Sequence, residues 1–152
     1  SEMCIRDRLG TTGMESGELV RAVSERLRPA CVIAVDALAS RSLKRVCRTV
    51  QLADTGIAPG SGVGNHRAAL DRASLGVPVI AVGVPTVVDG ATLAADLLGT
   101  EELPPLGEGR DLMVTPKDID SQVADLSKVI GYGIDLALQP SLTLEDLDLL
   151  LS

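Results

Sequence analysis

The residue best placed for chemistry is Asp36, which directly follows the apolar run Cys-Val-Ile-Ala-Val at residues 31–35. A continuous apolar run of this length is typical of a strand covered on both faces, as in a parallel sheet. Such a strand holds a carboxylate in one position, and burial disfavours its charged form. A carboxylate held this way can act as a general base on water or as one member of an acid/base pair. A helix or turn cap fits the same position, and the spacing alone leaves both roles open.

A second candidate is Asp54, because Asp54-Thr55-Gly56 follows an apolar segment, as in the active-site pattern of pepsin-like and retroviral aspartic proteases. Those enzymes share a proton between two neighbouring aspartates. Their folds are all-β, whereas this chain shows helical patterns, and an isolated triplet of this kind is also common in turns. We therefore keep a pepsin-type protease that uses Asp54 only as an alternative.

The segment Gly-Ser-Gly-Val-Gly-Asn at residues 60–65 suggests a loop that binds phosphate. The dinucleotide fingerprint has a third glycine where this sequence has Asn65. The fingerprint also follows a strand directly, whereas this segment begins eight residues after the predicted strand 49–52. We favour a turn-rich loop, in which glycines permit positive φ. A non-catalytic α/β domain that binds an anion or nucleotide through the backbone amides of residues 54–66 is the second functional hypothesis.

The other titratable residues show no metal or triad signature. His66 is the single histidine, and the cysteines, Cys4, Cys31 and Cys47, form no CxxC pair. A zinc site needs several such ligands at short spacing, so we predict no metal and no other cofactor. Free thiols are expected in a reducing, cytoplasmic-type compartment. Asp89 lies early in a predicted helix, where a favourable interaction with the helix dipole accounts for it.

Composition narrows the classes of function. The chain has 152 residues, 45% of them hydrophobic, which suits a single folded domain. With no Phe, no Trp and one Tyr, it lacks the aromatic platforms of base-stacking nucleic-acid modules. Its 14 Lys and Arg against 21 Asp and Glu give a net charge of −7, which disfavours binding to DNA and to anionic membranes. Its longest apolar runs contain Pro and Gly and stop short of the roughly 18 residues of a transmembrane span.

Alternating helices and strands are predicted to position these residues. Apolar periodicity predicts helices over residues 17–28, 41–46, 86–98 and about 117–138. Strands are predicted over residues 31–35, 49–52, 77–83 and 112–114, with a long loop at 54–66 and a Pro/Gly-containing connection at 101–110. This alternation favours an α/β domain around a mostly parallel sheet, in which the carboxyl ends of the strands carry the chemistry.

Four longer motifs resemble the spore germination protease (GPR endopeptidase) family. They are LGTTGMESGE at 9–18, VIAVDALASRSL at 32–43, DTGIAPGSGVGN at 54–65 and GVPVIAVGVPTVVD at 76–89, and Val114-Thr-Pro-Lys117 continues the likeness. The likeness covers about residues 9–138. It implies the C-terminal portion of a three-layer α/β sandwich, with a mostly parallel or mixed sheet flanked by helices, similar to the hydrogenase maturation endopeptidases.

The resemblance also implies an activity. Family members are endopeptidases that degrade small acid-soluble spore proteins during germination, made as zymogens and assembled as homotetramers in the cytoplasm of the spore core. Their partners are protein substrates, and their site uses two aspartates and no metal. The aspartate of the VIAVDALASR motif falls on Asp36, and the other lies upstream of residue 9, in a segment that this chain does not contain. Since a carboxylate pair needs both members, we expect this chain alone to be inactive or nearly so.

The resemblance divides the chain into three parts. Residues 1–8 include MCIRDR, which resembles a translated sequencing adapter, so we set them aside as a non-native scar. Residues 9–140 are expected to form a partial α/β peptidase domain, and residues 141–152 a C-terminal tail. The missing N-terminal part should supply at least one strand and the helix after it. Its absence should expose an unpaired strand edge and apolar surface.

Overall fold

The computed structural model describes residues 16–59, 68–100 and 112–151. Predictions that concern Cys4, His66 and residues 1–8, 60–65 and 101–110 lie outside the described residues. None of the described helices combines the length and the apolarity that a membrane crossing requires.

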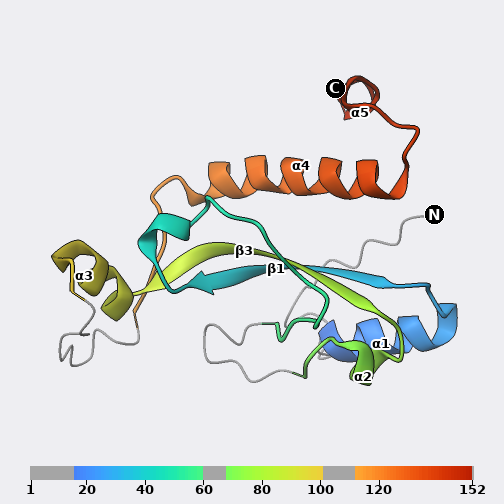
Figure 1. The fold of residues 1–152 in the computed structure, drawn as a ribbon, viewed down its shortest axis with the longest axis horizontal. Helices are drawn as coiled ribbons and strands as arrows, with labels where there is room; N and C mark the ends of the chain where they lie inside the picture. Colours follow the sequence, from blue (N-terminus) through green and yellow to red (C-terminus); the bar gives the residue numbers. More distant parts are fainter. Residues whose placement is uncertain (1–15, 60–67, 101–111, 152) are drawn as a thin grey trace.

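The described strands form one mixed sheet of four strands, β1 (Val32–Ser40), β2 (Gln51–Ala53), β3 (Val79–Asp89) and β4 (Met113–Val114). The long strand β3 is central. It pairs with β1 in parallel, with β2 in antiparallel orientation, and through its C-terminal end with β4, again antiparallel (Figure 1). Within the described part of the chain β1 therefore lies at one edge of the sheet.

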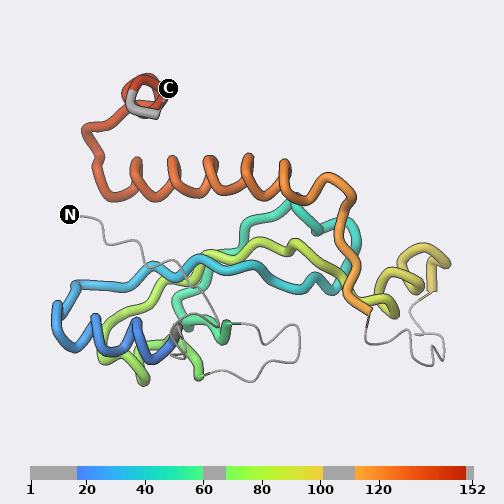
Figure 2. The backbone as a smooth tube through the Cα atoms, turned by 180° about the vertical axis from the view of Figure 1, so that it is seen from behind, coloured from blue at the N-terminus to red at the C-terminus, as the bar shows by residue number. Residues whose placement is uncertain are grey.

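Helices lie on both sides of this sheet. Figures 1 and 2 show α1 (Ser16–Leu27) and α2 (Arg72–Leu75) on one side and α4 (Ile119–Leu138) on the other. The helix α3 (Gly90–Leu98) continues from the end of β3, and the 3-10 turn η1 (Leu43–Arg45) lies between β1 and β2. The tail forms α5 (Leu144–Leu151). This arrangement confirms an α/β fold in which helices flank a mixed sheet.

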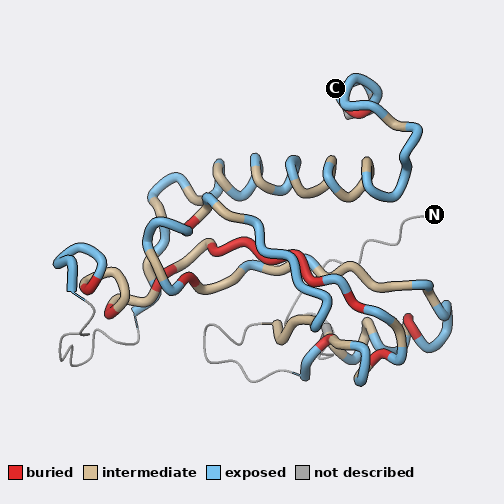
Figure 3. Tube along the Cα trace, viewed as in Figure 1, coloured by how far each residue is buried: buried red, intermediate tan, exposed pale blue. Residues whose placement is uncertain are grey.

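The core lies between the sheet and the helices α1 and α2. Its centre is Val79 of β3, buried together with Leu70 and Leu75, and Val20 and Val32 pack against this cluster. Val32 and Val79 are paired across β1 and β3, so their side chains point to the same face. Figure 3 shows that burial in the sheet follows β3 rather than β1.

The face of the sheet on the side of α4 is unevenly covered: Val82 and Val84 of β3 are buried, each with 6% of its surface exposed. Val35, Ile80 and Leu52 share this face by register, and their exposed fractions are 53%, 41% and 72%. No described residue of α4 is buried. Val35, Ile80 and Leu52 are therefore apolar residues that no described element covers fully. The exposure expected from a missing N-terminal part stays a prediction.

The predicted bounds of the two longest strands were wrong. β1 continues to Ser40 instead of ending at residue 35, and β3 continues to Asp89, although a helix was expected from residue 86. The two strands pair over this whole length, with a register shift after Leu38, which pairs with Pro85. Because Pro has no N–H to donate to the ladder, an irregularity at this position lets the pairing resume beyond it.

Smaller elements also differ from the prediction. Residues 41–46 hold a single 3-10 turn instead of a helix, and a short helix, α2, forms where none was predicted. Only one of the three strand pairings is parallel, so the sheet is mixed rather than mostly parallel. By contrast, α1 and α4 lie close to their predicted bounds, and α4 is assigned as a single helix through Gly131 and Gly133.

Candidate functional site

Asp36 lies in the middle of β1 and not at its carboxyl end, which corrects the predicted position. It is half-buried and pairs with Gly83 of β3. Its Oδ1 accepts a hydrogen bond from the backbone N–H of Ala37 at 2.9 Å, and no other described residue bonds to this carboxylate. A residue in a strand interior caps neither a helix nor a turn. The Asp36 carboxylate therefore keeps most of its acceptor capacity for water or a ligand.

A row of three paired residues crosses the sheet at Asp36. Gly83 of β3 pairs with Asp36 of β1 on one side and with Gln51 of β2 on the other. Directly paired residues point to the same face of a sheet, so the Asp36 and Gln51 side chains flank a position that has no side chain. Gln51 is exposed. The two polar groups thus share the face on which Val32 and Val79 are packed, further along the strands.

Leu38 limits the space above Gly83. A Cβ atom added at Gly83 would overlap Cδ1 of Leu38 and lie 2.8 Å from its Cγ. The preceding row on the same face contains only alanines, Ala34, Ala81 and Ala53. The surroundings of Asp36 on this face are therefore small and apolar, with Gln51 as the polar side chain of its row.

The structure places Asp54 in a turn. Asp54 is exposed in a bend after β2, and no hydrogen bond or ion pair joins it to Asp36. Gly56 follows with a φ of 86°, and a Cβ there would overlap the carbonyl oxygen of Leu70. Ile57 and Leu70 then exchange two backbone hydrogen bonds, of 2.9 and 2.7 Å. The turn role and the α/β fold together overturn the pepsin-type alternative, which requires an all-β protein.

Asp89 has the structural role that was predicted, although it precedes α3 rather than lying within it. It is the N-cap of α3, and its carboxylate accepts from the backbone N–H and from the hydroxyl of Thr92, at 2.8 and 2.6 Å. The hydroxyl of Thr92 is the main cause that lowers the pKa of Asp89, and the backbone N–H groups of Thr92 and Ala91 act in the same direction.

The described residues contain no cluster of metal ligands, and the environment of Cys47 disfavours a reactive thiolate. No group of three or more His, Cys, Asp and Glu side chains among them could hold a metal ion. Cys31 and Cys47 are free and partly buried. Burial raises the pKa of the Cys47 thiol, and the nearby carboxylate of Asp118 raises it further. Since the thiolate is the reactive form, Cys47 is poorly suited to act as a nucleophile.

Sequence reasoning proposed Asp36 as a candidate site residue but did not predict that Gln51, Gly83 and Leu38 lie beside it. One signal for Gly83 was present, because a glycine inside an apolar strand indicates a close approach by another group. Gln51 carried no such signal, since its place beside Asp36 depends on how β2 pairs with β3.

Comparisons with known proteins relate this site to one family. The family profile described as germination protease (peptidase A25) matches residues 5–100. The match begins inside the segment 1–8, whose origin as a scar stays a prediction. The matched range includes β1, β2 and β3, and with them Asp36, Gly83 and Gln51.

Individual relatives agree with this match. The chain is 44% identical to the germination protease of Clostridium perfringens (strain 13, type A), over 92% of this chain and 52% of the relative. It is 42% identical to that of Caldanaerobacter subterraneus, over 94% and 53%, and 34% identical to that of Bacillus pumilus, over 91% and 54%. The chain thus spans about half the length of the curated relatives it matches. It belongs to the germination protease family.

Proposed function

We propose that this chain is part of an endopeptidase that degrades small acid-soluble spore proteins during spore germination, and that Asp36 is its catalytic aspartate. Family membership supports a protease. The observation that supports this role for Asp36 is its place in the sheet. Its carboxylate is half-buried, lies opposite Gly83 and accepts a hydrogen bond from the backbone of the adjacent Ala37, and the residue falls inside the matched region.

In this proposal Asp36 takes a proton from the attacking water, while a second acidic group protonates or polarises the scissile carbonyl. No described carboxylate bonds to Asp36, and Gln51, on the same row, carries a neutral amide that cannot supply a proton in this way. The second aspartate of the family site would come from the segment upstream of residue 9. The chain by itself is then inactive or nearly so.

The free edge of β1 supports the same proposal. Among the described residues β1 pairs only with β3, which leaves its outer N–H and C=O groups without partners from another strand. A strand from the upstream segment that paired with this edge would lie beside Asp36. We also propose that the intact protein is a zymogen and a homotetramer located in the spore core.

A chimera tests this function. Residues 9–152 of this chain replace the matching part of the Clostridium perfringens relative, and cleavage of a small acid-soluble spore protein is followed by mass spectrometry. The chimera is expected to cleave the substrate, whereas Asp36→Asn in the chimera and the 152-residue chain alone are expected to show no cleavage. Asp120→Asn, which removes an exposed carboxylate on α4, is the matched control and should keep full activity.

Two results would contradict the proposal. Equal activity of the chimera with and without Asp36→Asn would remove Asp36 from the mechanism. Cleavage by the chain alone at a rate within about tenfold of an intact relative, abolished by Asp36→Asn, would show that Asp36 needs no upstream aspartate.

The second hypothesis, an anion or nucleotide site in residues 54–66, gains no support from the described contacts, and residues 60–65 lie outside them. A shift of several degrees in melting temperature with a nucleotide would favour that hypothesis.

A further inference from the structure

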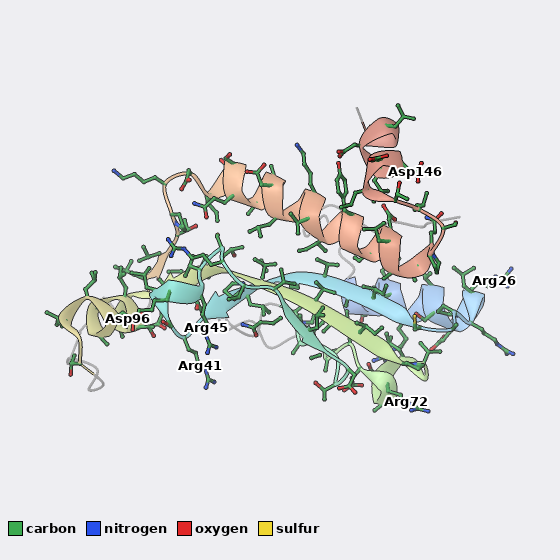
Figure 4. All side chains as sticks on the ribbon, turned by 45° about the horizontal axis from the view of Figure 1, so that its top comes forward. Arg26, Arg41, Arg45, Arg72, Asp96 and Asp146 are labelled. Carbon is green, nitrogen blue, oxygen red and sulfur yellow. The ribbon has the colours of Figure 1, made fainter. Side chains whose placement is uncertain are left out.

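The connection between β1 and β2, residues 41–48, is strongly basic. It carries Arg41, Lys44, Arg45 and Arg48 and no acidic residue, in a protein with a net charge of −7. All four side chains are exposed, and none forms an ion pair with a described residue. Figure 4 shows Arg41 and Arg45 projecting from the same side of the ribbon. Four like charges with no ion-pair partner among the described residues repel one another, so this surface is suited to an anionic partner.

The acidic groups beside this connection are already engaged. Asp96 of α3 accepts hydrogen bonds from the backbone N–H of Leu43, at 2.6 Å, and from the hydroxyl of Ser42, at 3.2 Å. Asp118, whose charge acts on Cys47, accepts from the side-chain amide of Gln122 at 2.7 Å. Among the described residues the four cations therefore outnumber Asp96 and Asp118, the carboxylates shown here, and both of these hold local structure.

The backbone of this connection is fixed at several points. Asp96 binds the N–H of Leu43 at the start of the 3-10 turn. Val46 is buried, with 6% of its surface exposed, and the N–H of Cys47 donates to the carbonyl of Pro85 at 2.7 Å. An ordered backbone holds the cations near one another before a partner arrives, which lowers the entropy cost of binding.

We propose that residues 41–48 form a docking surface for an acidic, extended segment of a protein partner. A polypeptide is favoured over a nucleic acid because the sequence has no Phe and no Trp on which bases could stack. The four cations are spread over eight consecutive residues, so a partner with several linked carboxylates can pair with more of them at once than a single compact ion can. The surface is distinct from Asp36, so the proposal does not rest on the catalytic role.

Fluorescence anisotropy tests the proposal on the full 152-residue chain, with a fluorescein-labelled peptide of ten Glu residues and a matched peptide of ten Gln residues. The Glu peptide is expected to bind at least about tenfold more tightly at low salt, and to lose most of that advantage at roughly 0.3 M salt. Arg41→Glu with Arg45→Glu should abolish the difference between the two peptides.

The matched control is Arg26→Glu with Arg72→Glu, which changes the net charge equally but lies on α1 and α2, toward the other end of the molecule (Figure 4). This control should bind the Glu peptide within about threefold of the unaltered chain. If the charge-reversed pair at 41 and 45 fails to fold by circular dichroism, Arg41→Gln with Arg45→Gln provides the same test without reversed charge.

Three results would overturn the proposal. The first is equal binding of the Glu and Gln peptides, and the second is an equal loss in both double variants, which would assign the effect to net charge alone. The third is tighter binding of a DNA 12-mer than of the Glu peptide, which would make the surface a nucleic-acid site.

Discussion

Gly83, the residue paired with Asp36, has no free space for a side chain of its own. It lies between Asp36 and Gln51 in one row of the sheet, and the side chain of Leu38 packs where its own side chain would stand. Any larger residue at Gly83 must displace Leu38 or bend the strand. The glycine is thus a packing requirement of the site.

The first prediction concerns this contact. Gly83→Ala should lower the free energy of unfolding by about 1–3 kcal/mol, because overpacking forces neighbouring side chains out of their rotamers. Urea denaturation measures the change. The control is Gly131→Ala on α4, where an added Cβ meets nothing within 4 Å and should stabilise the helix by about 0.5–1 kcal/mol. Unchanged stability of Gly83→Ala, together with unchanged stability of Leu38→Ala, would show that the two residues do not pack together.

The second prediction concerns the N-cap of α3. The folded-state pKa of Asp89 is lowered, so its ionised form contributes stability above the unfolded-state value, near 4, and that stability is lost as the pH falls through the folded-state pKa. Asp89→Ala should cost about 1 kcal/mol at pH 7 and less at pH 3. Asp89→Asn, a good N-cap that does not titrate, should stay close to the unaltered protein at pH 7. A cost for Asp89→Ala that does not change with pH would contradict this account.

At the scale of residues, local patterns were enough to single out Asp36 as a candidate and to predict a structural role for Asp89, but not to place Gln51 beside Asp36. The first two follow local patterns, an apolar run and a helix start. Gln51 reaches the row of Asp36 only through the antiparallel pairing of β2 with β3, which no local pattern contains.

Among the elements, β1 and β3 show how tertiary pairing overrides a local pattern. The apolar spacing over residues 86–98 predicted a helix, yet residues 86–89 extend β3 because β1 and β4 both pair there. Val is frequent in this stretch and favours a strand. The sequence predicted the existence of these elements, whereas their ends depended on neighbours distant in the chain.

The third prediction concerns the edge formed by β1. Val35 is 53% exposed on this strand, and a long apolar edge promotes pairing between molecules, so we expect the isolated chain to self-associate. Val35→Lys should shift it toward monomer in size-exclusion chromatography with light scattering. Val129→Lys on α4, at a residue with 62% exposure, should have a smaller effect. A stable monomeric wild-type chain would count against the proposed edge.

For the whole molecule, the sequence predicted the α/β class because helical and strand patterns alternate along the chain. It did not predict that β2 and β4 run antiparallel to β3, since strands as short as these leave little periodicity to analyse. The exposed part of the face toward α4, which lies beside the buried Val82 and Val84, also depends on the assembled sheet.

The fourth prediction concerns that exposed face. The isolated chain should bind a fluorescent dye for apolar surface, because Ile80 and Leu52 are 41% and 72% exposed. The chimera with the Clostridium perfringens segment should bind less dye per molecule if that segment covers the sheet. Equal dye binding by chain and chimera, at matched concentration, would show that the segment covers other surfaces.

The two backbone hydrogen bonds between Ile57 and Leu70 have a practical consequence for engineering. They hold Ile57 and Leu70, the two ends of the intervening stretch, next to each other. The positive φ of Gly56 directs the chain into this pair. Since the entropy cost of closing a loop grows by only about 0.6 kcal/mol for each doubling of its length, lengthening that stretch should cost little closure entropy. An epitope or affinity tag inserted between these two residues would leave the register of the neighbouring strands intact.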